Sequence, residues 1–454
     1  MNKSEENLQQ KIVSLCKRRG FVFPGSEIYG GLANTYDFGP LGVLMLRNII
    51  DSWWDFFVTK RTNMYGLDTA IFMSPKVWEA SGHTASFNDL LVDCKECKNR
   101  TRADSLIEET TLQRVEGFKE TEIKRILEEK KIKCPNCGAF NWTQPRKFNL
   151  LFETHIGIVP ENQSLTYLRG EIAQGMFVNF KNILDTMRPR LPFGIAQSGK
   201  VFRNEITKGN FIFRTLEFNL AEFEYFFDPK KDNWEKVFEY WQGEMKKWIT
   251  SLGVLENRLK WRVHSDEERS HYSQKTVDLD YEFGFGYKEL FGLAYRTDYD
   301  LKNHIEKSGA DLQYTDPDTG EKFIPHVVEP TFGMTRTFLA LLTEGYTEDK
   351  DRIVLKLAKD IAPYKVAVFP LVKNKPELVS KAESIYKMFV DGGVSAAWDD
   401  RGNIGKRYYA QDEIGTPFCV TVDYQTLEDD TVTLRNRDTT EQIRIKISDL
   451  LNKI

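Results

Sequence analysis

An arginine and a glutamate two residues apart are the residues of this sequence whose spacing most directly suggests chemistry. Arg203 and Glu205 lie in the segment GKVFRNEITKGN, whose strand-like alternation places both side chains on one face. Such a pair on a rigid strand suits binding of a polyanion and its metal ion. The alternative is a salt-bridged edge hairpin that turns at residues 207–210. In either case we predict that residues 211–227 form the returning strand.

Two CxxC pairs offer a second kind of chemistry. The cysteines are Cys94, Cys97, Cys134 and Cys137, and a glycine follows the last of them. Four thiolates suit tetrahedral zinc, and a site with four protein ligands has no open position for catalysis, so we expect structural zinc. Free cysteines or a redox pair are the alternatives. The charged segment 106–133 between the pairs is predicted to be helical.

Three further charged residues occupy unusual positions. Glu171 lies between an apparent strand end and a helix, where an ordinary helix-start charge is the alternative. Glu289 is an acid on a predicted strand. Arg336 falls in the first turn of an apolar helix that follows a strand ending near residues 329–330 and a turn at Gly333. Because a cation there opposes the helix dipole, Arg336 is a candidate contact for an anion or a ring.

Length and composition limit the class of protein. A chain of 454 residues with 41% hydrophobic and 29% charged residues is expected to fold into two or three globular domains. The net charge of −4 excludes a global basic field, so nucleic acid would be bound by local patches. We see neither a signal peptide nor an apolar run of membrane-spanning length, and we expect a cytoplasmic protein without a membrane partner.

The elements that must position these residues follow from hydrophobic periodicity. Helices are predicted over residues 1–20, 44–57 and 234–252, and two strands with a turn over 261–300. His83 is expected to be a structural or surface histidine rather than a ligand. From residue 361 strands alternate with helices, which indicates a mixed α/β module of roughly ninety residues. We place the linker at residues 359–363, and hence the domains at 1–360 and 361–454.

In this order the motifs resemble those of class II aminoacyl-tRNA synthetases. The segments YGGLANTYDFGPLG, PKVWEASGH, FRNEI, DYEFGFGYKELFG and EPTFGMTR are similar to those of glycyl-tRNA synthetases of the homodimeric type, over nearly the whole chain. The resemblance implies an α+β fold: an antiparallel-sheet catalytic domain (1–360) with a zinc-binding insertion (94–137), and a C-terminal mixed α/β anticodon-binding domain (361–454). The hairpin would be the second class motif, and residues 327–344 the third.

The resemblance also implies a reaction and its partners. Glycine and ATP would form glycyl-adenylate and pyrophosphate, and glycine would then pass to the 3′ end of tRNA(Gly). The cofactors would be Mg²⁺ with ATP and structural Zn²⁺, and the chain would be a homodimer. Glu289 would help to hold the magnesium, and residues 208–211 at the hairpin tip would meet the acceptor end of the tRNA.

The family's site residues carry over wherever the local motif matches. Arg203, Glu205 and Arg336 would be catalytic, with Phe218 and Arg336 on opposite sides of the adenine. Glu171, Glu222 and Glu329 would surround the ammonium group of glycine, and Arg102 would meet its carboxylate. The full ATP set is Arg203, Asn204, Glu205, Phe213, Arg214, Thr215, Leu216, Glu217, Phe218, Glu289, Leu290, Gly333, Met334, Thr335 and Arg336. The full glycine set is Arg102, Glu171, Phe218, Asn219, Leu220, Ala221, Glu222, Glu329, Pro330, Thr331, Phe332 and Gly333.

The sequence departs from the family pattern in four places. Leu216 replaces an arginine, which puts one tRNA or nucleotide contact in doubt. Asn219 and Leu220 replace a Glu-Gln pair, and residues 153–155 differ from the common pattern. Thr331 stands where serine is usual, and its extra methyl group would tighten a glycine pocket.

Two other functions fit the same architecture. The first is a non-catalytic binding subunit, such as the polymerase accessory factor of this architecture, but such a protein has no need of Arg203, Glu205, Glu289, Glu329 and Arg336. The second is a ligase for another small amino acid, against which the combination of motifs argues.

Overall fold

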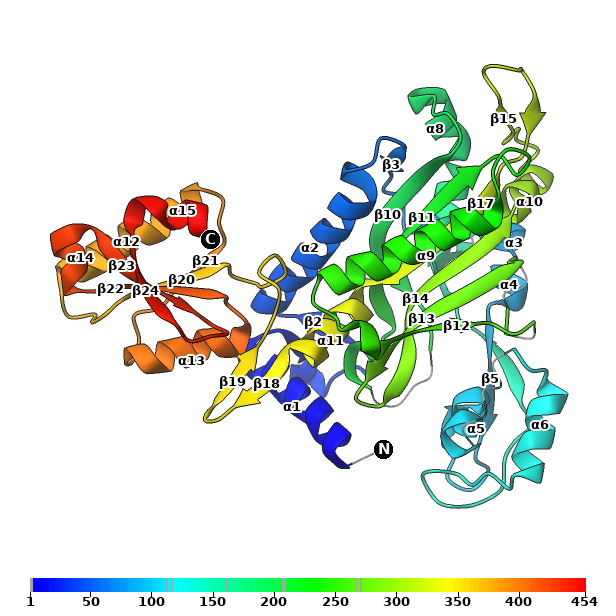
Figure 1. Ribbon diagram of the computed structural model, residues 1–454. Helices are drawn as coiled ribbons and strands as arrows, with labels where there is room; N and C mark the ends of the chain where they lie inside the picture. The colour runs from blue at the N-terminus through cyan, green and yellow to red at the C-terminus, as the bar shows by residue number, and fades with distance from the viewer. Residues whose placement is uncertain are drawn as a thin grey trace.

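The computed structural model describes residues 3–454 except 112, 114, 116, 160–161, 206–209, 267 and 270–271. It has a large part built on a seven-stranded sheet and a smaller C-terminal part built on a five-stranded sheet, joined by a hairpin (Figure 1). The hairpin consists of β18 (Tyr346–Asp349) and β19 (Arg352–Leu355). Both parts mix helices with sheets, which agrees with the α+β expectation.

The seven-stranded sheet has the order β12-β13-β14-β17-β11-β10-β3. Its neighbours pair antiparallel, except that β3 runs parallel to β10. The strands are β12 (Leu259–Val263), β13 (Lys275–Phe283), β14 (Gly286–Thr297), β17 (His326–Gly333), β11 (Glu217–Phe227), β10 (Phe193–Phe202) and β3 (Met64–Gly66).

Helices cover one face of this sheet and bury its aromatic side chains. Trp53, Trp241 and Trp248 from the helices pack with Phe223 of β11 and Phe332 of β17 in the main core. Because strand side chains alternate, the residues next to these phenylalanines project from the opposite face, where the candidate site lies. The covering helices are α1 (Lys3–Arg19), α2 (Pro40–Trp54) with its extension η2 (Asp55–Thr59), α9 (Trp234–Ser251) and α11 (Met334–Gly345).

Shorter elements enclose the opposite face. Phe177 and Phe180 of two of these helices pack against Phe226 of β11 in a second core. The helices are α3 (Pro75–Ala80), α4 (His83–Ser86), α7 (Ala173–Val178), α8 (Phe180–Met187) and α10 (Tyr299–Ser308). A three-stranded sheet of β4 (Phe72–Met73), β9 (Ser164–Leu168) and β8 (Phe152–Ile156) lies beside them.

An insertion lobe projects from the sheet next to β12 (Figure 1). Its own three-stranded sheet has the order β6-β5-β7, and Val92, Ile107, Ile123 and Leu127 form its separate core. The strands are β5 (Asn88–Asp93), β6 (Arg100–Arg102) and β7 (Arg146–Asn149), and the helices are α5 (Ala103–Thr111) and α6 (Glu120–Glu129). The predicted helical segment 106–133 is therefore two helices.

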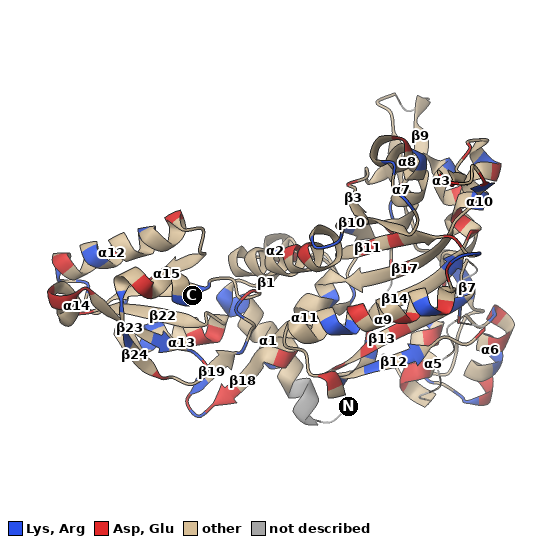
Figure 2. Cartoon of the chain, turned by 45° about the horizontal axis from the view of Figure 1, so that its top comes forward, with Lys and Arg blue, Asp and Glu red and all other residues tan. Residues whose placement is uncertain are grey.

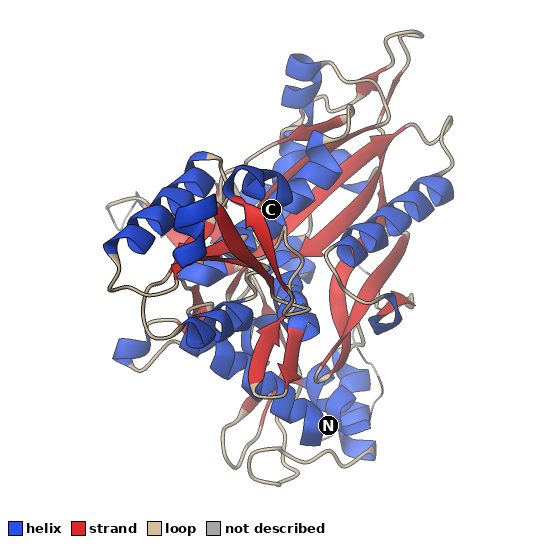
Figure 3. Ribbon diagram, turned by 60° about the vertical axis from the view of Figure 1, so that its left-hand side comes forward, coloured by secondary structure: helices blue, strands red, loops and turns tan. Residues whose placement is uncertain are grey.

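The C-terminal part has helices on both sides of its sheet (Figure 3). The predicted alternation is confirmed in β20 (Val366–Pro370), α12 (Pro376–Asp391), β21 (Ala396–Trp398), α13 (Ile404–Ile414) and β22 (Phe418–Val422). The closing elements are α14 (Tyr424–Asp429), β23 (Thr431–Asn436), β24 (Gln442–Lys446), η6 (Ile447–Asp449) and α15 (Leu450–Lys453). Buried Asp412 of α13 accepts hydrogen bonds from Arg352 and Arg435, both at 2.7 Å, and so ties this part to the β18–β19 hairpin.

The remaining short elements connect these parts. They are β1 (Val22–Pro24), η1 (Glu27–Tyr29), β2 (Tyr36–Phe38), η4 (Phe211–Phe213), η5 (Glu256–Arg258), β15 (Tyr314–Thr315) and β16 (Lys322–Phe323). Basic and acidic residues are interspersed along the chain (Figure 2). Within the described residues, no helix is both long and apolar enough to pass through a bilayer.

The predicted helices over 1–20, 44–57 and 234–252 are confirmed, but several strand limits were wrong. β10 ends at Phe202, so Arg203 and Glu205 lie beyond the strand; there the backbone N–H of Asn204 donates instead to the carbonyl of Leu150 at 2.8 Å. The returning strand begins at Glu217 after a 3₁₀ turn. β17 continues to Gly333, because Thr331 still pairs across both neighbouring strands. Residues 259–297 hold three strands, since the tight turn between β13 and β14 forms a hairpin of its own.

Candidate active site

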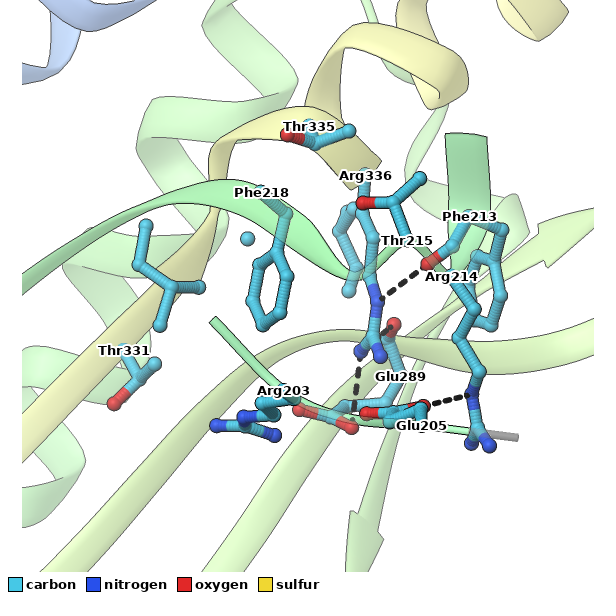
Figure 4. Close-up of a pocket in the computed structure, with 13 residues that line it drawn as sticks. Arg203, Glu205, Phe213, Arg214, Thr215, Phe218, Glu289, Thr331, Thr335 and Arg336 are labelled. Atoms are coloured by element: carbon cyan, nitrogen blue, oxygen red, sulfur yellow. Dashed lines mark hydrogen bonds and ion pairs between the residues drawn. The ribbon is translucent and has the colours of Figure 1, made fainter. Parts of the chain in front are cut away.

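A cavity of about 530 Å³, including its open mouth, lies between the end of β10, β11, β14 and the junction of β17 with α11 (Figure 4). Most of the residues in the predicted ATP set meet here. The lining residues are Arg203, Glu205, Phe213, Arg214, Thr215, Phe218, Leu220, Glu289, Leu290, Thr331, Gly333, Thr335 and Arg336. Basic, acidic and aromatic side chains thus line one concave surface.

Two rings and a carbonyl hold Arg203. Its guanidinium lies 5.2 Å from the ring centroid of Phe87 and 5.4 Å from that of Phe218. Its Nε donates to the carbonyl of Gly170 at 3.1 Å. Cation–π contacts restrict the guanidinium without neutralising its charge, so Arg203 stays able to bind an anion in the cavity.

Glu205 lies between two arginines. Its carboxylate is 3.5 Å from Nε of Arg214 and 3.9 Å from Nη1 of Arg102. Burial alone would raise the pKa of Glu205, but the charges of Arg214 and Arg102 lower it below its usual value. Glu205 is therefore an ionised hydrogen-bond acceptor at the wall of the cavity.

Arg336 joins the first turn of α11 to β14. Its Nη1 lies 3.0 Å from the carboxylate of Glu289 and donates to that residue's carbonyl at 2.9 Å, while the guanidinium lies 4.6 Å from the ring centroid of Phe213. Although burial alone would raise the pKa of Glu289, the charge of Arg336 lowers it to about 2. The Glu289 side chain is half-exposed and its carboxylate is ionised, as a cation ligand must be.

A second, acidic cluster lies next to the cavity on the same face of the sheet. Its acids are Glu171, Glu222, Glu224, Asp300 and Glu329, all buried. Arg296 contacts Glu329 at 2.9 Å, Asp300 at 2.7 Å and Glu171 at 4.0 Å. Glu222 accepts from the backbone N–H groups of Ile172 and Ala173, at 2.9 and 3.0 Å. Among the described residues of the cluster, the acids outnumber the guanidinium five to one.

This excess of acids changes the pKa values of the individual carboxyl groups. Burial, followed by repulsion from Glu171, raises the pKa of Glu222 to about 7. Burial also raises the pKa of Glu329 to about 8 against the opposing charge of Arg296, and repulsion from Glu222 adds to the rise. Burial opposes ionisation of Glu171 too, but His83 and Arg296 hold its pKa well below the usual value. The cluster therefore favours an added cation.

Sequence reasoning missed Arg296 and underrated His83. Arg296 is the extra residue of a β-bulge in β14, between the pairs Tyr295↔Val328 and Thr297↔Val327. Its one sequence signal is a charge within the apolar run LFGLAYRT, which has the composition of a buried strand. His83, expected to be a structural or surface histidine, lies 3.1 Å from Glu171 and hydrogen-bonds Ser81 at 2.8 Å.

Other residues of the predicted sets lie at the edge of the cavity or away from it. Ala221, Phe332 and Met334 pack in the main core. Asn204 bonds Leu150, and Glu217 pairs with Lys200 at 3.1 Å. The backbone N–H of Asn219 donates to Thr335 at 3.0 Å. Neither Leu216 nor the buried Pro330 is among the described residues that line the cavity. Of the predicted tRNA-contacting tip, residues 208–211, the first two lie outside the described residues, and Asn210 and Phe211 lie at the start of η4.

Arg102 lies among acids other than those of the acidic cluster. It contacts Asp89 at 2.9 Å and Asp104 at 2.5 Å, and Glu205 is its third acidic neighbour. Its contact with the carboxylate of glycine therefore stays a prediction.

The four predicted metal-binding cysteines meet at one end of the insertion lobe. Their four Sγ atoms lie within 4.8 Å of one another, with Cys94 and Cys137 3.6 Å apart and Cys97 and Cys134 3.7 Å apart. Tetrahedral ligands at the usual zinc–sulfur length of about 2.3 Å lie about 3.8 Å apart. The donors and their spacing therefore fit a zinc ion.

Known proteins resemble both parts of the chain. A family model described as an anticodon binding domain matches residues 365–454. The chain is 51% identical over 449 residues to a protein of Caldanaerobacter subterraneus subsp. tengcongensis, covering 96% of this chain and 95% of the relative. It is 50% identical over 458 residues to one of Alkaliphilus oremlandii, covering 98% and 97%. A protein of Geobacillus thermodenitrificans is 49% identical over 451 residues, covering 97% and 96%.

All three relatives are named glycine–tRNA ligase. The relatives define the class of this chain as aminoacyl-tRNA ligase. It belongs to the glycine–tRNA ligase family, as its motifs predicted.

Proposed function

We propose that the chain activates glycine with ATP and transfers it to the 3′ end of tRNA(Gly). One observation carries the proposal: the basic–aromatic cavity and the acidic cluster share neighbouring positions of β11 and β17. Leu220 pairs with Gly333 at the cavity, and Glu222 pairs with Thr331 two residues further along each strand, on the same face of the sheet. Glycine bound through its ammonium group by the acids would thus present its carboxylate to a phosphate bound at Arg203.

The first reaction needs placement more than proton transfer. The glycine carboxylate is already an anion when it attacks the α-phosphate of ATP, so no general base is required. Arg203 would stabilise the charge that develops on the phosphate, and Glu289 would hold Mg²⁺, which would neutralise phosphate charge. Phe218 and Arg336 line the same cavity and would enclose the adenine, with Glu205 accepting from its amino group.

Glycine would be selected by charge and by space. Glu171, Glu222 and Glu329 would receive the ammonium group, with Arg296 orienting Glu329 from behind through two hydrogen bonds of 3.0 and 2.9 Å. Thr331 lines the cavity and carries a methyl group that a larger amino acid would meet. A steric clash with a larger side chain rejects a competing amino acid more strongly than the loss of one methylene contact does.

The finer assignments belong to the same proposal. Residues 1–360 would be a class II catalytic domain and residues 361–454 the anticodon-binding domain. Zinc on the four cysteines would stabilise the insertion, since four thiolates give a closed structural site. Homodimerisation and a cytoplasmic location stay predictions.

Amino-acid-dependent ATP–pyrophosphate exchange tests the proposed function. We expect exchange with glycine at a kcat/KM at least about a hundredfold above that with alanine, the smallest competitor that carries a side chain. Charging of tRNA(Gly) measured in parallel would test the second step. Equal exchange with alanine, or none with glycine, would refute the assignment.

Glycine binding is expected to weaken as pH falls from 8.5 to 6.5. The raised pKa values of Glu222, about 7, and Glu329, about 8, mean that these acids take up protons in this range. A protonated acid cannot pair with an ammonium group, so the KM for glycine should rise by up to about tenfold per pH unit for each proton displaced. The KM for ATP, measured at saturating glycine, serves as the control and should change little. A KM for glycine independent of pH would contradict this coupling.

A further inference from the structure

The ATP-binding trio Arg203, Asn204 and Glu205 lies beyond the end of β10. β10 ends at Phe202, and the hydrogen bond of the Arg203 backbone N–H to Leu216, at 2.9 Å, is the last one to the hairpin partner. The hairpin adds the Phe218 ring at Arg203 and the Arg214 guanidinium 3.5 Å from Glu205, and segments outside the hairpin supply the other contacts to the trio.

The insertion lobe and its flanks contact each member of the trio in turn. The ring of Phe87, directly before β5, lies under the Arg203 guanidinium at 5.2 Å. The carbonyl of Leu150, directly after β7, accepts from the Asn204 backbone N–H at 2.8 Å. Arg102, the last residue of β6, lies 3.9 Å from the Glu205 carboxylate. All three strands of the lobe sheet thus end at the ATP-binding trio.

The same three strands meet the cysteines at their opposite ends. Cys94 follows the last residue of β5, Cys97 lies in the turn to β6, and Cys94 forms a β-bridge with Trp142 ahead of β7. In both CxxC turns a backbone N–H donates back to the backbone carbonyl of the first cysteine, from Lys98 to Cys94 at 2.9 Å and from Gly138 to Cys134 at 2.8 Å. A metal on the four thiolates would lock the register of the strands whose other ends hold the trio.

Arg102 is the strongest link in this arrangement. It is buried, and the carboxylates of Asp89, Asp104 and Glu205 lie at 2.9, 2.5 and 3.9 Å from its guanidinium. Asp89 and Asp104 belong to the lobe, whereas Glu205 belongs to the ATP cavity, so the guanidinium bridges the two. A second link, from Lys288 next to Glu289 to Glu108 of α5 at 3.2 Å, joins the lobe to β14.

We propose that the four-cysteine lobe positions the ATP site, with Arg102 as the positioning residue for Glu205. The inference rests on the proposed function and adds a structural role for the lobe in ATP binding. Two roles of Arg102 can be told apart by measurement. If Arg102 contacts the carboxylate of glycine, its replacement would change the KM for glycine. If Arg102 positions Glu205, its replacement would change the affinity for ATP.

The test compares Arg102→Lys with Arg100→Lys. Arg100 lies on the same strand and also pairs with an aspartate, Asp93 at 2.7 Å, but it is exposed at the cysteine end. We expect Arg102→Lys to raise the Kd for ATP, measured by calorimetry without glycine, by about tenfold, because lysine cannot bridge several carboxylates. Its KM for glycine should stay within about twofold, and Arg100→Lys should resemble wild type.

Two further measurements apply if Arg102→Lys fails to fold. Lys288→Gln, at a half-exposed position, should raise the Kd for ATP by about twofold to fivefold while the fold is kept. Chelator-treated protein, shown by metal analysis to have lost its zinc, should bind ATP at least about tenfold more weakly than zinc-reconstituted protein.

The outcomes distinguish the two proposals. Wild-type protein without glycine-dependent exchange would refute the proposed function. If the wild type is active and a folded Arg102→Lys variant binds ATP with normal affinity, only the positioning role is overturned. Unchanged ATP affinity in both the Lys288→Gln protein and the metal-free protein would overturn it as well. An increase in the KM for glycine alone would assign Arg102 to the substrate carboxylate.

Discussion

Replacing Arg203 by alanine is expected to lower glycine-dependent ATP–pyrophosphate exchange by about a hundredfold to a thousandfold, with the fold intact. The reason is that its guanidinium lines the cavity, and a preorganised cation at developing charge contributes about that much to kcat. The fold should persist because Nε donates a single hydrogen bond, to Gly170, and the rings of Phe87 and Phe218 can close over the gap. Pre-steady-state formation of glycyl-adenylate measures the effect directly.

Two variants frame this result. Arg203→Lys keeps the charge but loses the planar contact with both rings, so we expect an intermediate loss of rate. Lys200→Ala removes an exposed cation of β10, three residues before Arg203. Lys200 pairs with Glu217 at 3.1 Å, and its loss should leave exchange unchanged. Near-wild-type adenylate formation by Arg203→Ala would mean that another cation stabilises the phosphate.

The sequence was most informative where a single local pattern decides the structure. Three features are as predicted: the helix that carries Trp53, the helix start at Arg336 and the meeting of the two CxxC pairs. Periodicity or short-range spacing defines each of them. Glu289 and Arg203 could be placed in one cavity through motif resemblance, and the structure does bring them together. The sequence immediately around either residue does not indicate that the two lie in one cavity.

What could not be predicted depends on contacts between distant segments. Arg203 appeared to lie on a strand, yet β10 stops before it because Leu150, far away in the chain, takes the next backbone hydrogen bond. The bulge that sets apart Arg296 arises from pairing of β14 with β17 and has no signature in residues 286–297 alone. Arg102 could be assigned to a motif, but its acidic partners are set by the fold of the lobe.

Replacing Arg296 by methionine is expected to abolish glycine activation and to lower the free energy of unfolding by about 3–5 kcal/mol at pH 8. Removing one member of a buried ion pair leaves its partners uncompensated, here Asp300 and Glu329. The stability deficit should shrink as pH falls, because burial raises the pKa of Glu329 to about 8 and this acid can then take up a proton and become neutral. Denaturant unfolding followed by tryptophan fluorescence reports on the large part through Trp53, Trp241 and Trp248.

An exposed pair of the same spacing is the matched control. Arg296 and Asp300 are four residues apart and buried, whereas Lys181 and Asp185 are four residues apart with side chains 54% and 59% exposed. Lys181→Met should therefore cost no more than about 0.5 kcal/mol. The double variant Arg296→Met/Asp300→Asn should regain stability but not glycine activation, because it removes a repelling charge without restoring the group that orients Glu329. Equal costs for Arg296→Met and Lys181→Met would show that protonation of the buried acids already neutralises the cluster.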